Sequence, residues 1–95
     1  MNIKELHTKE KTVSAISIFK SALASATAIQ ILPGGKLKEH ISKAPAFLIC
    51  IEGKVVFENE KGLKEILSPG DYINIEANVK HWIDGIMESY LLLVK

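Results

Sequence analysis

Turn-forming residues divide most of the sequence into short apolar segments, and this punctuation limits the fold more than any other feature. Between residues 13 and 94, segments rich in valine, isoleucine, leucine and aromatic side chains alternate with glycine, proline or asparagine. We expect strands at residues 13–19, 25–32, 37–41, 47–52, 54–58, 63–67, 72–76, 81–86 and 89–94. Many short strands with regularly spaced turns are typical of a sandwich or barrel. The pattern therefore predicts an all-β fold.

The alanine-rich stretch at residues 21–28 is the one place where helix and strand compete. Alanine and leucine favour a helix, whereas Thr27 and Ile29 favour a strand. The stretch has no helix-directing charge pattern and runs into the turn-forming residues 33–35. We therefore expect a strand over residues 25–32.

Length and composition indicate one domain that spans residues 1–95. A chain of this size has room for a single hydrophobic core. Residues 1–12 are mostly polar or charged, so we expect a loose arm or one helical turn there, followed by a barrel over residues 13–95. The net charge is only +1, and no basic stripe is interleaved with aromatic residues. Nucleic acid is therefore not an expected partner.

The sequence also predicts a cytoplasmic location. The amino terminus is charged where an exported chain would have a continuous apolar segment. The apolar run at residues 90–94 is far shorter than the ~20 residues needed to cross a bilayer, so no membrane partner is expected. The lone Cys50 cannot form an internal disulfide and lies among apolar residues. We expect it to be a buried small hydrophobe in a reducing compartment.

The last predicted strand bears on assembly. A half-exposed strand should alternate between apolar and polar residues, yet residues 91–94 are apolar on both faces. The N-terminal arm could cover the outer face, but a second copy of the chain would cover it more completely. We therefore predict a homodimer that packs partly through this sheet.

Two histidines far apart in the sequence each follow a glycine at a fixed distance, His40 after Gly34 and His81 after Gly70. They can converge only if the strands between them fold back on one another, which would form a pocket. Ser42 is two residues from His40 and would share its face of a strand. We expect His40, Ser42 and His81 to line a pocket for a small ligand.

These residues give the chain a resemblance to the small single-domain cupins, whose fold is a double-stranded β-helix or jelly-roll barrel. The first cupin motif is glycine, five residues, histidine, one residue, histidine, three or four residues, glutamate, six residues, glycine. Gly34, His40 and Gly53 stand at matching places. The second motif is glycine, five residues, proline, one residue, glycine, two residues, histidine, three residues, asparagine. Gly70 and His81 match it.

Other motif positions carry different residues. Ser42 stands at the place of the second histidine, and Ala46 at the place of the glutamate. In the second motif, Glu76 replaces the proline, Asn78 the glycine and Gly85 the asparagine. Of the four metal ligands that the resemblance implies, only His40 and His81 remain. Two imidazoles alone make a weak metal site, although Glu76 or His7 from the arm would complete it if either reached it.

Two functions follow as hypotheses. The first is a binding module that holds a small polar metabolite, a sugar or a carboxylate, through His40, Ser42 and His81, and needs no cofactor. The alternative is a metal-dependent cupin enzyme of the isomerase or dioxygenase type. In that case His40 and His81 would bind a divalent metal such as zinc, iron, manganese or nickel. The serine and alanine at positions 42 and 46 favour the binding module.

Overall fold

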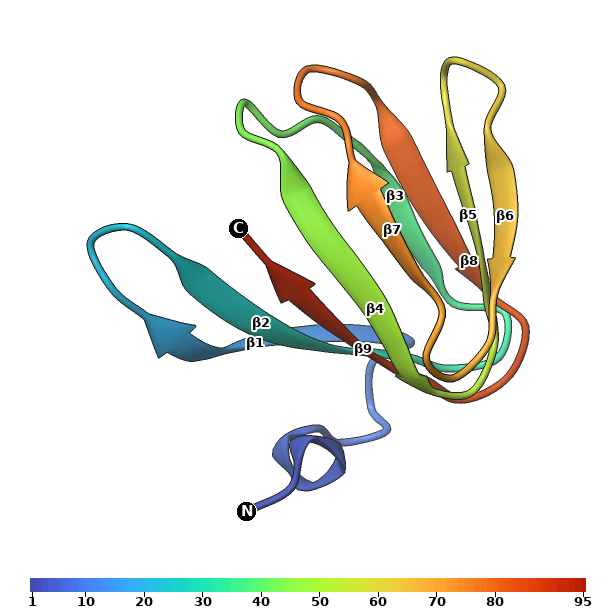
Figure 1. Cartoon of the computed structure of the whole chain (residues 1–95). Helices are drawn as coiled ribbons and strands as arrows, with labels where there is room; N and C mark the ends of the chain where they lie inside the picture. The colour runs from blue at the N-terminus through green and yellow to red at the C-terminus, as the bar shows by residue number, and fades with distance from the viewer.

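Nine strands and one short 3-10 helix make up the chain, and the computed structural model describes all residues from Met1 to Lys95 (Figure 1). In order, they are η1 (Ile3–Leu6), β1 (Val13–Lys20), β2 (Ser25–Ile31), β3 (Lys36–His40), β4 (Ala46–Glu52), β5 (Val55–Asn59), β6 (Lys64–Leu67), β7 (Tyr72–Ile75), β8 (His81–Gly85) and β9 (Ser89–Val94). Every predicted strand is present, and its ends differ from the prediction by at most one residue. No helix has the length and apolar character needed to span a membrane.

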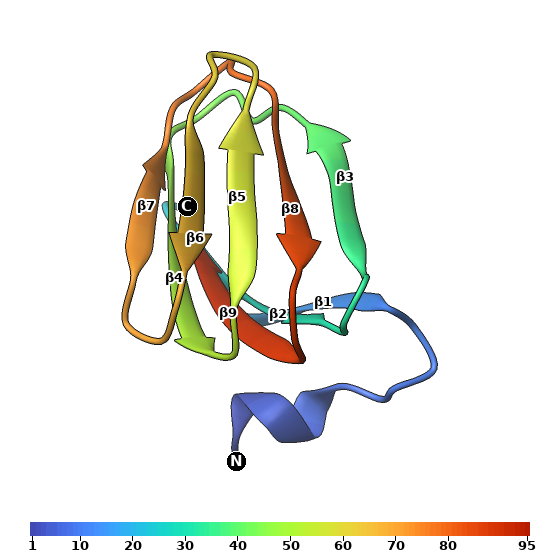
Figure 2. The same ribbon diagram turned by 90° about the vertical axis from the view of Figure 1, so that its right-hand side faces the viewer.

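The strands form two antiparallel sheets that face each other (Figure 2). The five-stranded sheet has the order β1-β2-β9-β4-β7, and the four-stranded sheet has the order β3-β8-β5-β6. Strands far apart in sequence are therefore neighbours, as in the pair β2 and β9. This is the jelly-roll arrangement, and it confirms the predicted fold class. The second half of the alanine-rich stretch lies in β2, between β1 and β9, so the choice of strand over helix from residue 25 is confirmed.

Alternation along each strand sends one set of side chains into the space between the sheets. In β4, Ala46, Leu48 and Cys50 are buried, while Phe47 and Ile49 are only partly buried on the outer face. The core consists of Ile29, Ile31, Ala46, Leu48, Cys50, Val55, Phe57, Leu67, Ile75, Ile83 and Leu91. Cys50 is fully buried and free, as predicted.

The turn at Gly53 fixes how β4 and β5 meet the end of β9. Gly53 has a φ of +92°, and a β-carbon there would lie 2.3 Å from the carbonyl oxygen of Glu88 and 2.4 Å from the hydroxyl oxygen of Ser89. The same hydroxyl accepts a hydrogen bond of 2.9 Å from the backbone N–H of Lys54. Only glycine fits this position, because it needs both a left-handed backbone and room for close approach.

The N-terminal arm runs across the outer face of the five-stranded sheet (Figures 1 and 2). The ring of His7 makes a hydrogen bond of 2.7 Å with the hydroxyl of Ser14, and the side chain of Gln30 donates to the carbonyl of Thr8 at 2.8 Å. Ion pairs join Lys4 to Glu52 and Lys9 to Glu88. The arm is therefore held by polar contacts at one end of the sheet.

Candidate functional site

His40 and His81 lie side by side at one end of the four-stranded sheet. They come from adjacent strands, β3 and β8, and stand directly opposite each other in register. Their Nε2 atoms are 2.9 Å apart, and their ring centroids are 4.1 Å apart. His81 is 2% exposed, whereas His40 is exposed. The structure thus brings together the two histidines that glycine spacing had singled out.

The backbone near both histidines holds the two strand ends together. The register of β3 and β8 shifts between Leu37 and His40, just before His40 pairs with His81. The N–H of Asn78 donates to the carbonyl of Ser42 at 2.7 Å, so the loop before β8 is tied to the segment after β3. Asn78 has a φ of +63°. It occupies a motif position that is glycine in the cupin pattern, and asparagine is among the few side chains that adopt this conformation readily.

Hydrogen bonding fixes how the two rings can interact. Nδ1 of His40 lies 3.1 Å from the carbonyl of Lys38, and Nδ1 of His81 lies 3.1 Å from the carbonyl of Val79. A carbonyl oxygen can only accept, so each Nδ1 carries the proton and donates it. Two neutral rings in this arrangement would direct two Nε2 lone pairs at each other. A proton or a cation between the Nε2 atoms is therefore required.

Burial decides which ring accepts. Burial lowers the pKa of His81, the nearby His40 lowers it further, and the hydrogen bond to Val79 opposes both effects. Charge is therefore disfavoured on the buried ring of His81, which is suited to accept a hydrogen bond at Nε2.

A small cavity of about 150 Å³ opens beside His81. Its lining consists of Phe57, Asn59, Lys61, Leu63, Asn74, Ile75, Glu76, Val79 and His81. The ring of Phe57 stacks against that of His81 with centroids 5.7 Å apart. Lys61, in the turn between β5 and β6, forms an ion pair of 2.5 Å with Glu76, which follows β7. Apolar walls and polar ends thus converge next to a buried imidazole.

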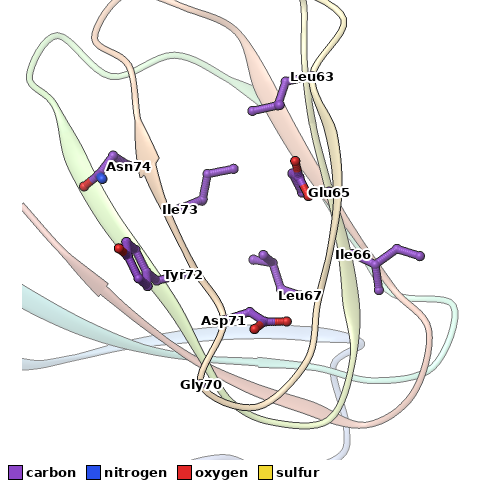
Figure 3. Close-up of a pocket in the computed structure, with 9 residues that line it drawn as sticks. All are labelled: Leu63, Glu65, Ile66, Leu67, Gly70, Asp71, Tyr72, Ile73 and Asn74. Carbon is purple, nitrogen blue, oxygen red and sulfur yellow. The ribbon is translucent and has the colours of Figure 1, made fainter.

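A larger groove of about 650 Å³ lies between the edge strands β6 and β7 (Figure 3). It is lined by Leu63, Glu65, Ile66, Leu67, Gly70, Asp71, Tyr72, Ile73 and Asn74. Neither histidine lines it. We assign the candidate site to the smaller cavity, because a buried imidazole and several polar side chains meet there.

The other predicted site residues lie elsewhere. The hydroxyl of Ser42 donates to the carbonyl of Ala44 at 2.9 Å, which forms a local turn, and Ser42 does not line the cavity. His7 contacts Ser14 on the outer face of the other sheet, so the idea that His7 completes the site is wrong. Glu76 lines the cavity but pairs with Lys61.

Sequence reasoning missed Asn59, Lys61 and Asn74. Asn59 and Lys61 belong to the turn that follows Phe57, whose inward position was a usable signal, because alternation places Asn59 on the same side. No comparable signal pointed to Asn74. It is an exposed residue of β7, and alternation along that strand places its side chain on the face opposite to Ile73 and Ile75.

The donor set for a metal is small. No group of three or more histidine, cysteine, aspartate or glutamate side chains is arranged to hold a metal ion. The two Nε2 atoms of His40 and His81 are the only converging pair of nitrogen donors at this site. They fit a metal in part, since a catalytic site commonly needs a third protein ligand.

Two facing antiparallel sheets with a histidine pair at one end define a jelly-roll barrel of the cupin type. The model of the cupin domain family matches residues 28–90, and the chain belongs to this family. A comparison with curated proteins gave no match.

Solved structures show the same fold. A cupin superfamily protein from Desulfitobacterium hafniense superposes with a TM-score of 0.87 at 17% identity, over 98% of this chain and 84% of that chain. A protein from Thermus thermophilus gives a TM-score of 0.83 at 24% identity, over 99% and 92%. An RmlC-like cupin from Shewanella frigidimarina gives 0.81 at 15% identity, over 92% and 78%. At these sequence identities, the similarity to the solved structures shows a shared fold only.

Proposed function

We propose that the protein binds a small polar metabolite, a carboxylate or a sugar, in the cavity beside the histidine pair. The observation that carries this proposal is the position of His81, which is buried in the wall of a cavity where Asn59, Lys61, Asn74 and Glu76 converge. The cavity volume of about 150 Å³ equals the share of about five water molecules in the liquid. A ligand of few non-hydrogen atoms therefore fits.

Charge favours a carboxylate over a neutral sugar. Lys61 can exchange its pairing with Glu76 for a ligand carboxylate, and Asn59 supplies an amide donor. Phe57 forms an apolar wall against the carbon skeleton of the ligand.

The test is a titration of the ¹⁵N-labelled protein with carboxylates of two to six carbons and with simple sugars, followed by NMR. We expect a carboxylate to shift the side-chain amide signal of Asn59 in a saturable manner. His81→Gln should abolish the shifts, while His7→Gln, a matched change on the far side of the molecule, should leave them intact. Shifts that persist in His81→Gln, or no shift with any compound, would contradict the proposal.

A metal-dependent enzyme is the second candidate, and one observation favours it. Both histidines donate Nδ1–H to a backbone carbonyl, which is the outer-shell pattern typical of metal-bound histidines. His40 and His81 would hold the metal through Nε2, and the metal would supply Lewis acid chemistry. The one carboxylate that lines the cavity, Glu76, is paired with Lys61. The donor set therefore supports the binding module better.

Elemental analysis of protein purified without chelator or affinity tag separates the two candidates. We predict zinc, iron, manganese and nickel well below one atom per chain, with carboxylate binding retained in the metal-free protein. A stoichiometric metal in the parent protein that is lost in the double variant His40→Ala, His81→Ala would instead support the enzyme.

A further inference from the structure

The two sheets each end in an unpaired strand on the same side of the molecule. β6 pairs only with β5, and β7 pairs only with β4, so one long edge of each strand has no neighbouring strand. The turn at residues 68–71 joins β6 to β7, and the groove of about 650 Å³ lies between them (Figure 3). The space between the sheets is therefore open to solvent along this side.

The register of β5 and β6 identifies the backbone groups that are free along the edge of β6. The N–H of Asn59 donates to the carbonyl of Leu63 at 3.1 Å, just before β6 begins. Because hydrogen-bonded and non-bonded pairs alternate in an antiparallel ladder, the N–H and C=O groups of Lys64 and Ile66 point away from β5. No turn or loop of the chain binds these groups. They are free to pair with an added strand.

The side chains that point into the groove combine apolar walls with unpaired negative charge. Glu65 pairs in register with the core residue Phe57, so its side chain lies on the face of β6 that looks toward the other sheet. Leu67 and Ile73 point into the same space (Figure 3). Neither Glu65 nor Asp71 forms an ion pair, and no basic side chain lines the groove.

These charges select the kind of strand that the edge accepts. An inward-pointing charge on an edge strand is a common protection against pairing with apolar strands. Glu65 and Asp71 therefore disfavour an apolar or acidic segment at this edge, whereas a segment with lysine or arginine side chains is complementary to them. The groove thus fits an extended basic segment.

We propose that β6 is the docking edge for an extended basic segment of a partner protein. The segment adds as an antiparallel strand and bonds to the free backbone groups of Lys64 and Ile66. Since side chains alternate along a strand, every second side chain of the segment faces the groove, and these are the basic ones, opposite Glu65 and Asp71.

The outward side chains of the segment are uncharged. They lie beside Ile66, which is 57% exposed and points away from the groove (Figure 3). Lys64 lies on the same outward face of β6 and would repel a second basic row. The partner segment therefore alternates basic with apolar residues.

The docking edge is separate from the proposed metabolite site. The groove and the smaller cavity share Leu63 and Asn74, but neither His81 nor Lys61 lines the groove. The docking proposal therefore does not rest on the proposed function. The variant His81→Gln distinguishes the two, because it should lose the carboxylate and keep the basic segment.

The test is an NMR titration of the ¹⁵N-labelled full chain with a blocked peptide that alternates lysine with valine. The peptide is about eight residues long, a usual strand length. The titration extends to about 2 mM, because a contact of this size is weak. We expect saturable shifts of residues 64–67, and no binding of a control peptide that alternates glutamate with valine.

Hydrogen exchange in deuterated water shows whether the peptide pairs as a strand. The amides of Lys64 and Ile66 should exchange rapidly in the free protein and at least ~10-fold more slowly at saturating peptide. The amides of Glu65 and Leu67, which the ladder directs toward β5 in both states, should keep their rates.

Two variants with matched controls separate the backbone contribution from the charge. Ile66→Pro removes a free N–H without breaking the ladder to β5, so it should weaken peptide binding at least ~5-fold, whereas Ile66→Val keeps that N–H and the affinity. Glu65→Lys should also weaken binding at least ~5-fold. Glu10→Lys makes the same change of charge in the exposed arm and should leave the affinity within about 2-fold.

Circular dichroism melts establish that each variant is folded. If Ile66→Pro does not fold, the exchange rates of Lys64 and Ile66 in the parent protein decide. Peptide shifts without slower exchange at these two amides would indicate a simple cation site and would overturn the proposal. So would the absence of saturable binding, equal binding of the glutamate peptide, or loss of peptide binding in folded His81→Gln.

Discussion

His40 and His81 each use Nδ1 to bind a backbone carbonyl, and so the backbone around Lys38 and Val79 directs both Nε2 atoms to one point. A short contact between two nitrogen lone pairs is unfavourable unless a proton or a cation lies between them. The same arrangement supports a metal only if further donors are supplied.

His7 presents the opposite problem, a buried ring nitrogen without a partner. Its Nδ1 bonds to Ser14, whereas its Nε2 is buried and has no hydrogen-bond partner. Burial lowers the pKa of His7 below the usual 6.5. The ring lies 6.3 Å from that of Tyr90, and Lys4 and Lys9 of the arm are paired with Glu52 and Glu88.

Acid should therefore loosen the arm. Because the unfolded chain binds the proton at a higher pH than the folded one, the free energy of unfolding should be constant above pH 6.5 and should fall as pH drops through 6.5. Urea denaturation at pH 7.5 and 5.5 measures the loss, which we expect to be about 1 kcal/mol or less. His7→Gln should remove part of it. A stability that rises toward pH 5.5 would contradict this assignment.

At the scale of the elements, turns position the strands and with them the site. Alternation and glycine punctuation are local signals, which is why the predicted strand ends differ by no more than one residue from those of the structure. Alternation along the strand, however, wrongly predicted that Ser42 lines the pocket. Strand β3 ends at His40, so alternation no longer applies two residues later, and Ser42 enters a turn with Ala44.

Lys61 and Asn74 show a second limit of prediction. Their place in the cavity depends on how the β5–β6 turn in one sheet sits over β7 in the other. That relation joins residues distant in sequence, and no local pattern encodes it. The glycine spacing marked His40 and His81 correctly, and the two rings meet because β3 and β8 pair with these residues in register.

Gly53 and Gly62 have similar backbone conformations. Comparing alanine variants at the two positions therefore distinguishes the cost of backbone strain from the cost of close packing. Gly53 and Gly62 have φ values of +92° and +89°, but a β-carbon at Gly62 would meet nothing within 4 Å. We expect Gly62→Ala to lower the free energy of unfolding by about 1 to 2 kcal/mol, the cost of a left-handed backbone. Gly53→Ala should cost about 1 to 3 kcal/mol more, because it also overpacks against Glu88 and Ser89. If urea denaturation gave the same loss of unfolding free energy for both variants, the prediction would be contradicted, because the close contacts at Gly53 would then add no cost.

For the whole molecule, the cavity depends on how the two sheets face each other. Ile75 of the five-stranded sheet and His81 of the four-stranded sheet both line it.

The central claim is that the fold pairs two distant imidazoles, His40 and His81, and that His81 forms part of the wall of the ligand cavity. Long-range ¹H–¹⁵N spectra of the three histidines, recorded during titration with the carboxylate that binds best, test it most directly. The account predicts that the ring nitrogens of His40 and His81 shift together with one dissociation constant, while those of His7 stay in place. Independent shifts of His40 and His81, or equal shifts of all three rings, would contradict it.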